Sequence, residues 1–176
     1  MPRHLLIMRH AKSDWDNGAA TDFERPLSKR GQHDAPLMGK WMDTQGLKPD
    51  HILSSPATRA KKTAALVCES LDIPISKIEW NQRIYEASLH DLLNILQEQP
   101  PDTKMVLLVG HNPGMDELVS YLCGNDTQRL PYGSLMPTAA LAHLSMPDDW
   151  TALKSDCAQL HSLTRPKDIK AIEQTQ

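Results

Sequence analysis

Short apolar runs alternate along the chain with longer segments in which apolar residues recur at every third or fourth position. The short runs have the length and composition of strands buried inside a parallel sheet, and they occupy residues 5–8, 51–54 and 105–109. The longer segments have the spacing of helices with one apolar face, and they occupy residues 28–44, 55–71, 88–99 and 112–123. The alternation predicts an α/β fold: a three-layer sandwich with a mostly parallel central sheet flanked by helices on both faces.

Residue types at the segment ends set the boundaries of the first two helices. Ser28 is a suitable N-cap, and Gly46 is a suitable stop for the helix that follows it. Pro36 lies inside that helix and predicts a kink or a shortened first segment. Ser55 followed by Pro56 predicts the N-cap and the first residue of the second helix.

Boundary signals continue through the second half of the chain. The stretch from Ser88 to Asp91 resembles a capping box, and Gly124 ends the helix that opens at Asn112-Pro113. Three further strands are predicted within residues 77–85, 138–144 and 157–163, with a loop rich in Pro, Gly and Asn before the second of them. The polar residues 167–176 predict a frayed tail. With neither repeats nor an interdomain linker, residues 1–176 are expected to form a single domain.

Charge and cysteine content exclude several classes of function. The chain has 19 Lys and Arg residues against 22 Asp and Glu residues, and no basic run with interleaved aromatics, so a nucleic-acid surface is not indicated. No apolar run approaches the ~20 residues that span a bilayer, and no signal-peptide pattern is present. The three cysteines are unpatterned, which is typical of buried thiols in a reducing compartment. We therefore expect a soluble, cytoplasmic protein.

Two histidines follow buried strands, at positions that a parallel sheet brings to one edge. Arg9 and His10 come directly after the first apolar run, and His111 follows the run at residues 105–109. In open α/β sheets, ligands bind in the crevice beyond the carboxyl ends of the strands. A lone histidine there is more often structural, but the adjacent arginine supplies a planar donor fork that suits phosphate oxygens. A neutral His10 is then a candidate nucleophile.

Arg59 falls in the first turn of the second helix, where unpaired backbone N–H groups favour anions. A solitary arginine is most often a surface charge, but two arginines and two histidines at one crevice predict a phosphate site. A metal site built from His10 and His111 is the alternative, and the chain lacks carboxylate or thiolate partners at suitable spacing. The other histidines are scattered and are expected in surface or strand-edge roles: His4, His33, His51, His90, His143 and His161.

Four short motifs carry a resemblance to a known family. They are Arg9-His10-Ala11-Lys12-Ser13, Leu27-Ser28-Lys29-Arg30-Gly31, Ser54-Ser55-Pro56-Ala57-Thr58-Arg59-Ala60 and Gly110-His111-Asn112-Pro113. In order and spacing, from residue 4 to about residue 168, they resemble the histidine phosphatase (phosphoglycerate-mutase-like) superfamily, above all its small SixA-type phosphohistidine phosphatase branch. The resemblance implies that His10 is the phosphate-accepting nucleophile. It also implies that Arg9, Arg59 and His111 hold the phosphoryl oxygens and stabilise charge in the transition state, and it places Ser13 among the substrate-binding residues.

The chain departs from the superfamily pattern in several places. Ala11 replaces the glycine that usually follows the histidine, which is a sterically mild change. Asp16 follows Trp15 where relatives carry a phosphate-contacting asparagine, so we expect Asp16 to face solvent, with Asn17 as a weak substitute. Many relatives take a general acid from a glutamate after the third strand. Glu86 lies in about that region and is the candidate proton donor, with a structural role at the helix start as the alternative.

These features predict a metal-independent phosphatase that works through phospho-His10 and needs no cofactor. Its expected substrate is phosphohistidine in a protein, because the leaving imidazole needs little help from a general acid. The alternatives are a small-molecule phosphomonoesterase and a non-catalytic phosphate-binding regulatory module. The predicted partner is therefore a phosphorylated protein or a small phosphorylated compound, with no role for nucleic acid or membrane.

Overall fold

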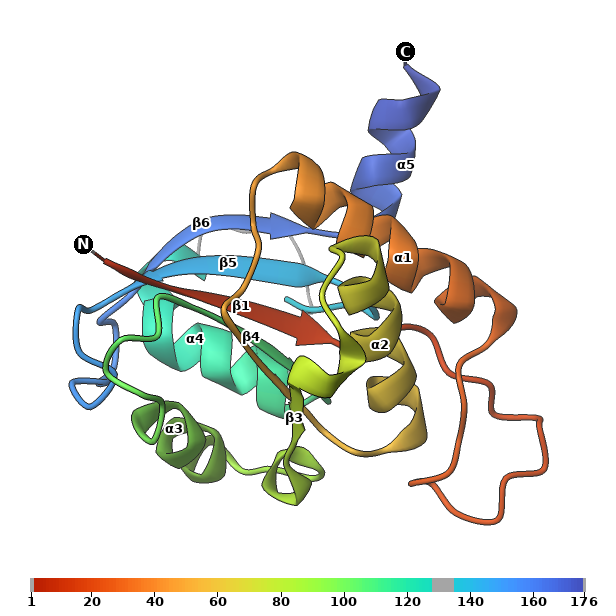
Figure 1. Ribbon diagram of the computed structural model, residues 1–176, viewed down its shortest axis with the longest axis horizontal. Coiled ribbons are helices and arrows are strands. Elements are labelled where there is room, and N and C mark those ends of the chain that lie inside the picture. The colour runs from red at the N-terminus through yellow and green to blue at the C-terminus, as the bar shows by residue number, and fades with distance from the viewer. Residues whose placement is uncertain (1, 128–134, 176) are drawn as a thin grey trace.

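The computed structural model describes residues 2–127 and 135–175, which build one six-stranded sheet with helices on both faces (Figure 1). The strands are β1 (Arg3–Arg9), β2 (His51–Ser54), β3 (Ile78–Trp80), β4 (Met105–Gly110), β5 (Leu141–Met146) and β6 (Gln159–Thr164). The helices are α1 (Lys29–Thr44), α2 (Thr58–Ser70), α3 (Leu89–Gln97), α4 (Gly114–Thr127) and α5 (Pro166–Gln174), with 3₁₀ helices at Ile75–Lys77 and Gln82–Ile84. No helix of these residues is long and apolar enough to cross a membrane.

The strand order β3-β2-β4-β1-β5-β6 puts the chain's first strand near the centre of the sheet. Strands β1 to β4 pair in parallel, whereas β5 pairs antiparallel to β1 and β6 pairs antiparallel to β5. The predicted mostly parallel sheet is confirmed, and the antiparallel strands are confined to one edge. Because β2, β4 and β1 are neighbours, their carboxyl ends lie side by side.

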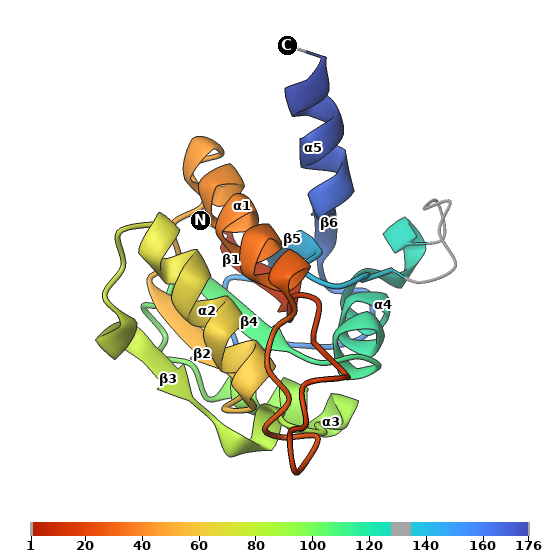
Figure 2. The same cartoon turned by 90° about the vertical axis from the view of Figure 1, so that its right-hand side faces the viewer.

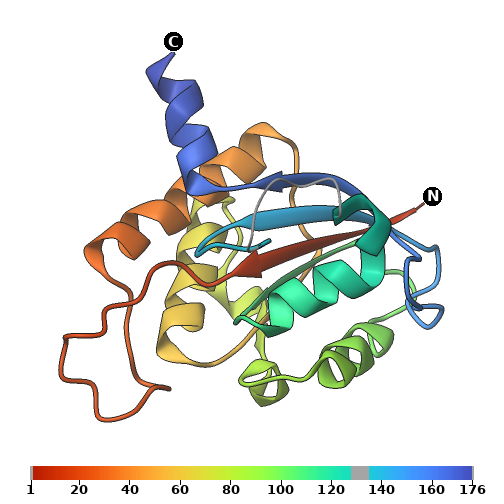
Figure 3. The same cartoon turned by 180° about the vertical axis from the view of Figure 1, so that it is seen from behind.

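Alternate side chains of β1 enter two separate apolar cores. Leu5 and Ile7 belong to the core that α3 and α4 cover, and Leu6 and Met8 belong to the core that α1 and α2 cover. Figure 2 shows the sheet edge-on between these layers, and Figure 3 shows α3 and α4 on the back face. A strand that is buried on both faces must be apolar at every position, which is why the central strands are recognisable in the sequence. The three-layer sandwich is confirmed.

Helix α2 begins two residues later than predicted. Its N-cap is Ala57, which makes no side-chain cap hydrogen bond, and its first residue is Thr58. The Ser55 hydroxyl instead accepts a hydrogen bond from the Ala57 N–H at 3.2 Å and lies 2.8 Å from His111 Nε2. Ser55 therefore closes a turn beside the site and does not cap the helix.

The other predicted caps and stops had mixed outcomes. The Ser28 N-cap and the capping box between Ser88 and Asp91 are confirmed. The shortening expected at Pro36 is wrong: α1 continues through it, and Gln32, whose carbonyl loses its helical donor, is exposed to solvent. Helix α4 starts at Gly114 and runs beyond its predicted end, although the φ of −141° at Cys123 interrupts it.

The predicted strand at residues 138–144 is displaced toward the C-terminus. Ala139 has a φ of +63°, a left-handed conformation outside strand geometry, so β5 begins at Leu141. The predicted strand in residues 77–85 is reduced to β3 and is followed by a 3₁₀ turn. Most of the Pro- and Gly-rich loop expected before β5 lies outside the described residues.

The frayed tail predicted for residues 167–176 is wrong, because residues 166–174 form helix α5, which extends away from the sheet in Figure 1. Asp168 accepts hydrogen bonds from the backbone N–H and the guanidinium of Arg165, at 2.7–3.0 Å. Ile169 is buried in the core below α1, and Lys170 donates to Asp34 at 2.8 Å. The buried Ile169 and the two ion pairs stabilise helix α5. Its other residues are mostly polar, so its sequence resembles that of a disordered tail.

Candidate active site

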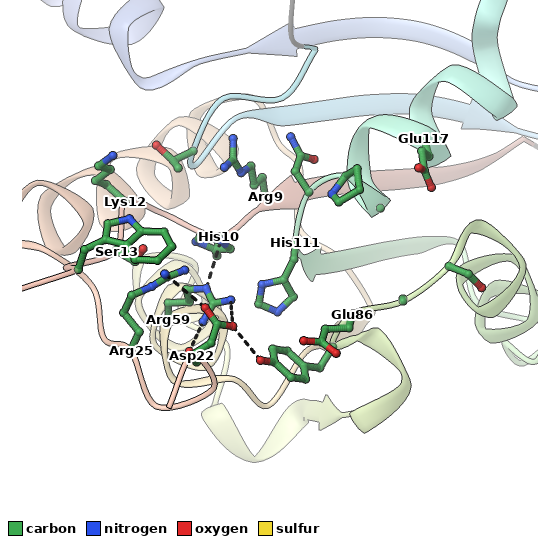
Figure 4. A pocket seen from close by; sticks show the side chains of 18 residues that line it. Arg9, His10, Lys12, Ser13, Asp22, Arg25, Arg59, Glu86, His111 and Glu117 are labelled. Carbon is green, nitrogen blue, oxygen red and sulfur yellow. Dashed lines mark hydrogen bonds and ion pairs between the residues drawn. The ribbon is translucent and has the colours of Figure 1, made fainter. Parts of the chain in front are cut away.

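A cavity of about 740 Å³ lies beyond the carboxyl ends of β1, β2 and β4 (Figure 4). His10 follows β1, Ser55 follows β2 and His111 follows β4. The His10 N–H donates to the Gly110 carbonyl at 2.9 Å, and the Ser55 N–H donates to the Val109 carbonyl at 3.1 Å. The predicted site residues all line this cavity: Arg9, His10, Ser13, Arg59, Glu86 and His111.

His10 is held as a neutral imidazole. Its Nδ1 lies 2.7 Å from the Ala11 carbonyl, and because a carbonyl only accepts, Nδ1 carries the proton. The other nitrogen, Nε2, therefore has a lone pair, and it accepts a hydrogen bond from Arg59 Nε at 3.4 Å. Burial lowers the pKa of His10 to about 3; the Ala11 carbonyl opposes that shift, and the nearby cationic side chains reinforce it. The lone pair is thus available over the whole neutral pH range.

Arg59 is buried and is oriented by a residue of the loop that follows β1. Its Nη1 donates to the Asp22 backbone carbonyl at 2.6 Å, and its Nη2 donates to the Asp22 carboxylate at 2.9 Å. The Tyr85 hydroxyl donates to the same carboxylate oxygen at 2.7 Å. The pKa of Asp22 is lowered, first by the hydrogen bond from Tyr85 and then by Arg59, with partial burial opposing. Asp22 is therefore an ionised clamp on Arg59.

The buried Thr63 hydroxyl joins the nucleophile's segment to the helix that carries Arg59. It accepts a hydrogen bond from the Ala11 N–H at 3.0 Å and donates to the Arg59 carbonyl at 2.7 Å. On the other side of this segment, Gly31 of α1 packs so closely on Lys12 that a Cβ would lie 2.1 Å from the Lys12 carbonyl oxygen. The residues after His10 are therefore fixed by both helices of this layer.

His111 completes the wall of the cavity beside the cationic Arg9 and Arg59. Its ring centroid lies 5.1 Å from that of His10, and the Tyr85 ring meets it nearly edge-on at 5.5 Å. Burial lowers the pKa of His111 to about 4, and Arg59 contributes to that shift. Its buried Nδ1 has no hydrogen-bond partner within residues 2–127 and 135–175. On β1, Arg9 donates from Nη1 to the Met136 carbonyl at 3.0 Å, which fixes its guanidinium at the cavity edge.

Sequence reasoning missed several residues that line the cavity, among them Asp22, Arg25 and Tyr85. Asp22 and Arg25 lie in a loop without periodicity, so no pattern indicated their contacts. The Arg25 guanidinium stacks 3.4 Å from the ring centroid of Trp15, whose side chain is 72% exposed at the cavity rim.

Asp16 is exposed and lies outside the lining, as expected, and Asn17 borders only a smaller hollow beside the loop.

Two carboxylates other than Asp22 line the cavity. Glu86 is exposed and has a φ of +56°, a left-handed conformation that residues other than glycine rarely adopt. Figure 4 shows it on the same side of the cavity as His111. The second carboxylate is Glu117, in the first turn of α4.

Three histidines outside the cavity are not scattered as predicted but pack together on β1, β5 and β6. His4 Nδ1 lies 3.1 Å from His143 Nε2, and the His143 and His161 ring centroids are 4.9 Å apart. Strand pairing brings them to one face, a proximity that was concealed because His4 lies more than a hundred residues from the other two. Within the described residues, no group of three or more His, Cys, Asp and Glu side chains is arranged to hold a metal ion.

Comparisons with known proteins agree with this geometry. The sequence model of the histidine phosphatase superfamily (branch 1) matches residues 5–92. An uncharacterised chloroplastic protein of Arabidopsis thaliana is 33% identical over 130 residues, which are 69% of this chain and 60% of that protein. The phosphohistidine phosphatase SixA of Escherichia coli K12 is 28% identical over 149 residues, which are 81% of this chain and 84% of SixA. A solved structure of the protein histidine phosphatase SixA complexed with tungstate has a TM-score of 0.79 and 25% identity, covering 94% of this chain and 99% of that one.

Proposed function

Because the chain belongs to the histidine phosphatase superfamily, we propose that it removes phosphoryl groups from phosphohistidine in proteins, through a covalent intermediate on His10. Its family and its similarity to SixA make it a phosphatase, an enzyme of the hydrolase class. The observation that carries the proposal is the neutral His10, whose Nε2 lone pair faces Arg59 at the cavity floor.

The reaction divides into two displacements at phosphorus. In the first, His10 Nε2 attacks the phosphoryl group, an N–P bond forms, and the bond to the leaving nitrogen breaks. The leaving imidazole takes up a proton from solvent and departs as a neutral ring. In the second, water attacks the phosphoryl group on His10 and loses a proton to solvent, the N–P bond breaks, and inorganic phosphate leaves with the neutral imidazole restored.

Two cationic side chains and a neutral histidine stabilise the charge that moves onto the phosphoryl oxygens. Arg9 and Arg59 supply guanidinium donors, and His111 supplies a ring nitrogen from the facing strand end. Ser13 is buried in the same lining, where its hydroxyl is a further donor for an oxygen of the substrate. These protein donors account for the charge stabilisation without a metal ion, so we propose a metal-independent reaction without a cofactor.

The size of the cavity supports a substrate larger than inorganic phosphate. About 740 Å³ falls in the range of pockets that enclose whole organic ligands, and the rim carries the exposed Trp15 ring. A phosphorylated side chain on a protein surface fits such a site, and SixA, named as a phosphohistidine phosphatase, supports this substrate class. We also propose a reducing compartment such as the cytoplasm, since Cys68, Cys123 and Cys157 are free thiols.

A small phosphomonoester is the second candidate substrate, and one observation favours it. Glu86 lines the cavity, where its carboxyl group is placed to protonate a leaving alkoxide. A phosphohistidine has no such need, because its imidazole leaving group is readily protonated. The two substrates are therefore distinguished by their dependence on Glu86.

The covalent step is tested by trapping the intermediate. Brief incubation with a ³²P-labelled phosphohistidine peptide, followed by quenching, should leave acid-labile, alkali-stable label on His10. The His10→Ala variant should lose both the label and turnover by several orders of magnitude. His33→Ala, which removes an exposed histidine of α1, is the matched control and should retain both. Full turnover by His10→Ala would exclude this mechanism.

A further inference from the structure

A second cavity, of about 400 Å³, lies between α1 and the start of α5. Its lining is unusually rich in cationic side chains and consists of Arg30, Asp34, Pro137, Thr138, Arg165, Pro166, Lys167 and Lys170. The proposed reaction assigns no role to it. The cavity exists because residues 166–174 form a helix against α1, which the sequence did not predict.

Positive charge exceeds negative charge in this cavity. The one carboxylate in its lining, Asp34, is buried and accepts from Lys170 at 2.8 Å, with Arg30 Nε at 3.6 Å. Arg165 pairs with Asp168. Two carboxylates thus face four cations, and Lys167 is exposed at the cavity mouth. Since the whole chain carries a net charge of −3, the positive charge is a local feature and not part of a basic surface.

Thr138 belongs to the lining of both cavities and forms the wall between them. Arg30 Nη2 reaches the Thr138 hydroxyl at 3.4 Å from the side of the second cavity. On the catalytic side, the Ala139 N–H donates to the carbonyls of Arg9 and His10, each at 3.1 Å. The wall is therefore fixed to the segment that carries the nucleophile, and the two cavities adjoin each other at Thr138.

We infer that the cavity between α1 and α5 is a second anion subsite, which binds a carboxylate side chain of the phosphoprotein substrate while the phosphorylated residue lies at His10. The inference rests on the proposed function. A carboxylate fits better than a second phosphate. The pairs with Asp34 and Asp168 leave only about two positive charges in the cavity. The negative charge of a phosphate dianion, together with that of the acidic residues flanking it, would exceed those two charges. The subsite makes acidic segments near the phosphorylated histidine preferred substrates.

The test compares two peptides that carry one phosphohistidine and differ only in their flanking residues, glutamates in one and glutamines in the other. At low ionic strength, kcat/KM for the glutamate peptide is expected to be roughly fivefold higher, mainly through KM. Lys167→Glu should abolish that preference. This variant keeps its fold, because an acidic residue in the first turn of α5 is favourable to the helix. Lys154→Glu, an exposed charge reversal elsewhere, is the matched control and should leave the preference intact.

Phosphoramidate, which has no acidic side chain, separates this inference from the proposed function. Wild type and Lys167→Glu should hydrolyse it equally. Equal kcat/KM for both peptides in an enzyme that hydrolyses phosphoramidate would overturn the subsite and leave the proposed function intact. If no phosphohistidine peptide is hydrolysed, the proposed function fails. The subsite is then decided by fluorescence anisotropy with the unphosphorylated glutamate peptide, whose binding Lys167→Glu must weaken for the inference to hold.

Discussion

Asp22 holds the guanidinium of Arg59 at both terminal nitrogens, through its backbone carbonyl at 2.6 Å and its carboxylate at 2.9 Å. This leaves the third guanidinium nitrogen of Arg59, Nε, directed at His10 Nε2. A residue of an irregular loop thus sets the direction of a cation that α2 contributes to the site. The loop at residues 12–27 therefore lines the cavity and also orients one of its catalytic side chains.

The Asp22–Arg59 contact predicts a specific pattern of non-additive losses. Arg59→Ala should reduce transition-state stabilisation by about 2–4 kcal/mol, measured as kcat/KM, because it removes one oxyanion donor. Asp22→Ala should reduce kcat/KM by roughly tenfold, because Arg59 remains but loses its orientation. If Asp22 acts only through Arg59, the double variant should be no worse than Arg59→Ala alone.

Asp16→Ala is the control for this series, because Asp16 is an exposed carboxylate of the same loop that lies outside the cavity. It should leave kcat/KM unchanged. Losses from Asp22→Ala and Arg59→Ala that multiply in the double variant would mean that Asp22 acts on the substrate directly and not through Arg59.

Burial of the histidines predicts an unusual pH dependence. The pKa values of His10, at about 3, and of His111, at about 4, lie below the ordinary value near 6.5, mainly because burial disfavours the charged ring. In an NMR titration of the free enzyme, neither ring should show a protonation midpoint above pH 5. A midpoint near 6.5 for His10 would contradict the neutral-nucleophile assignment.

The same depressed pKa values have a consequence for stability. Between about pH 6.5 and pH 4 these histidines bind protons in the unfolded chain but not in the folded one, so protonation favours unfolding. His143, whose pKa burial lowers to about 4, adds to the effect. The free energy of unfolding from urea titrations should therefore decrease as pH falls through this window.

The sequence predicted those site residues that lie at the ends of strands. Arg9, His10 and His111 could be predicted because each lies at or just beyond the carboxyl end of a strand with an apolar central run, and such runs are recognisable without a structure. Arg59 was correctly expected near the crevice, although Ser55 proved to bond to His111 rather than to cap the helix.

What the sequence did not reveal depends on contacts between distant segments. Asp22 and Tyr85 meet across 63 positions, and Lys170 meets Asp34 across 136. Neither pair is marked by a local sequence pattern. Asp22 lies in a loop, which has no periodicity, and Lys170 lies in a polar helix whose sequence resembles a disordered tail. The second cavity and the clamp on Arg59 both arise from such contacts, so both required the structure.

Removal of metal ions should leave catalysis unchanged. The proposed charge stabilisation comes from Arg9, Arg59 and His111, which together surround the oxygens without a Lewis acid. Dialysis against EDTA should preserve kcat/KM for a phosphohistidine peptide, and orthovanadate should still inhibit competitively. Activity that is lost in EDTA and restored by a divalent cation would require a metal in the mechanism.

Glu86 separates the two substrate classes. A phosphomonoester leaves as an alkoxide, so its departure depends on a positioned acid, an effect worth typically ~10²–10⁴-fold. Glu86→Gln keeps the size of the side chain and its hydrogen bonding but removes the transferable proton, and it leaves the left-handed backbone at this position as strained as before. We expect a large fall in any phosphomonoesterase activity and a change of less than about tenfold toward a phosphohistidine peptide.

Glu117→Gln is the matched control for that variant, because Glu117 also lines the cavity but belongs to α4. It should leave both activities within about twofold of wild type, as a carboxylate that transfers no proton. An equal loss of both activities in Glu86→Gln would mean that the enzyme protonates every leaving group, which removes the chemical reason for a phosphohistidine preference. Two unchanged activities would assign Glu86 to the turn before α3 and direct the search for a proton donor to the other polar side chains that line the cavity.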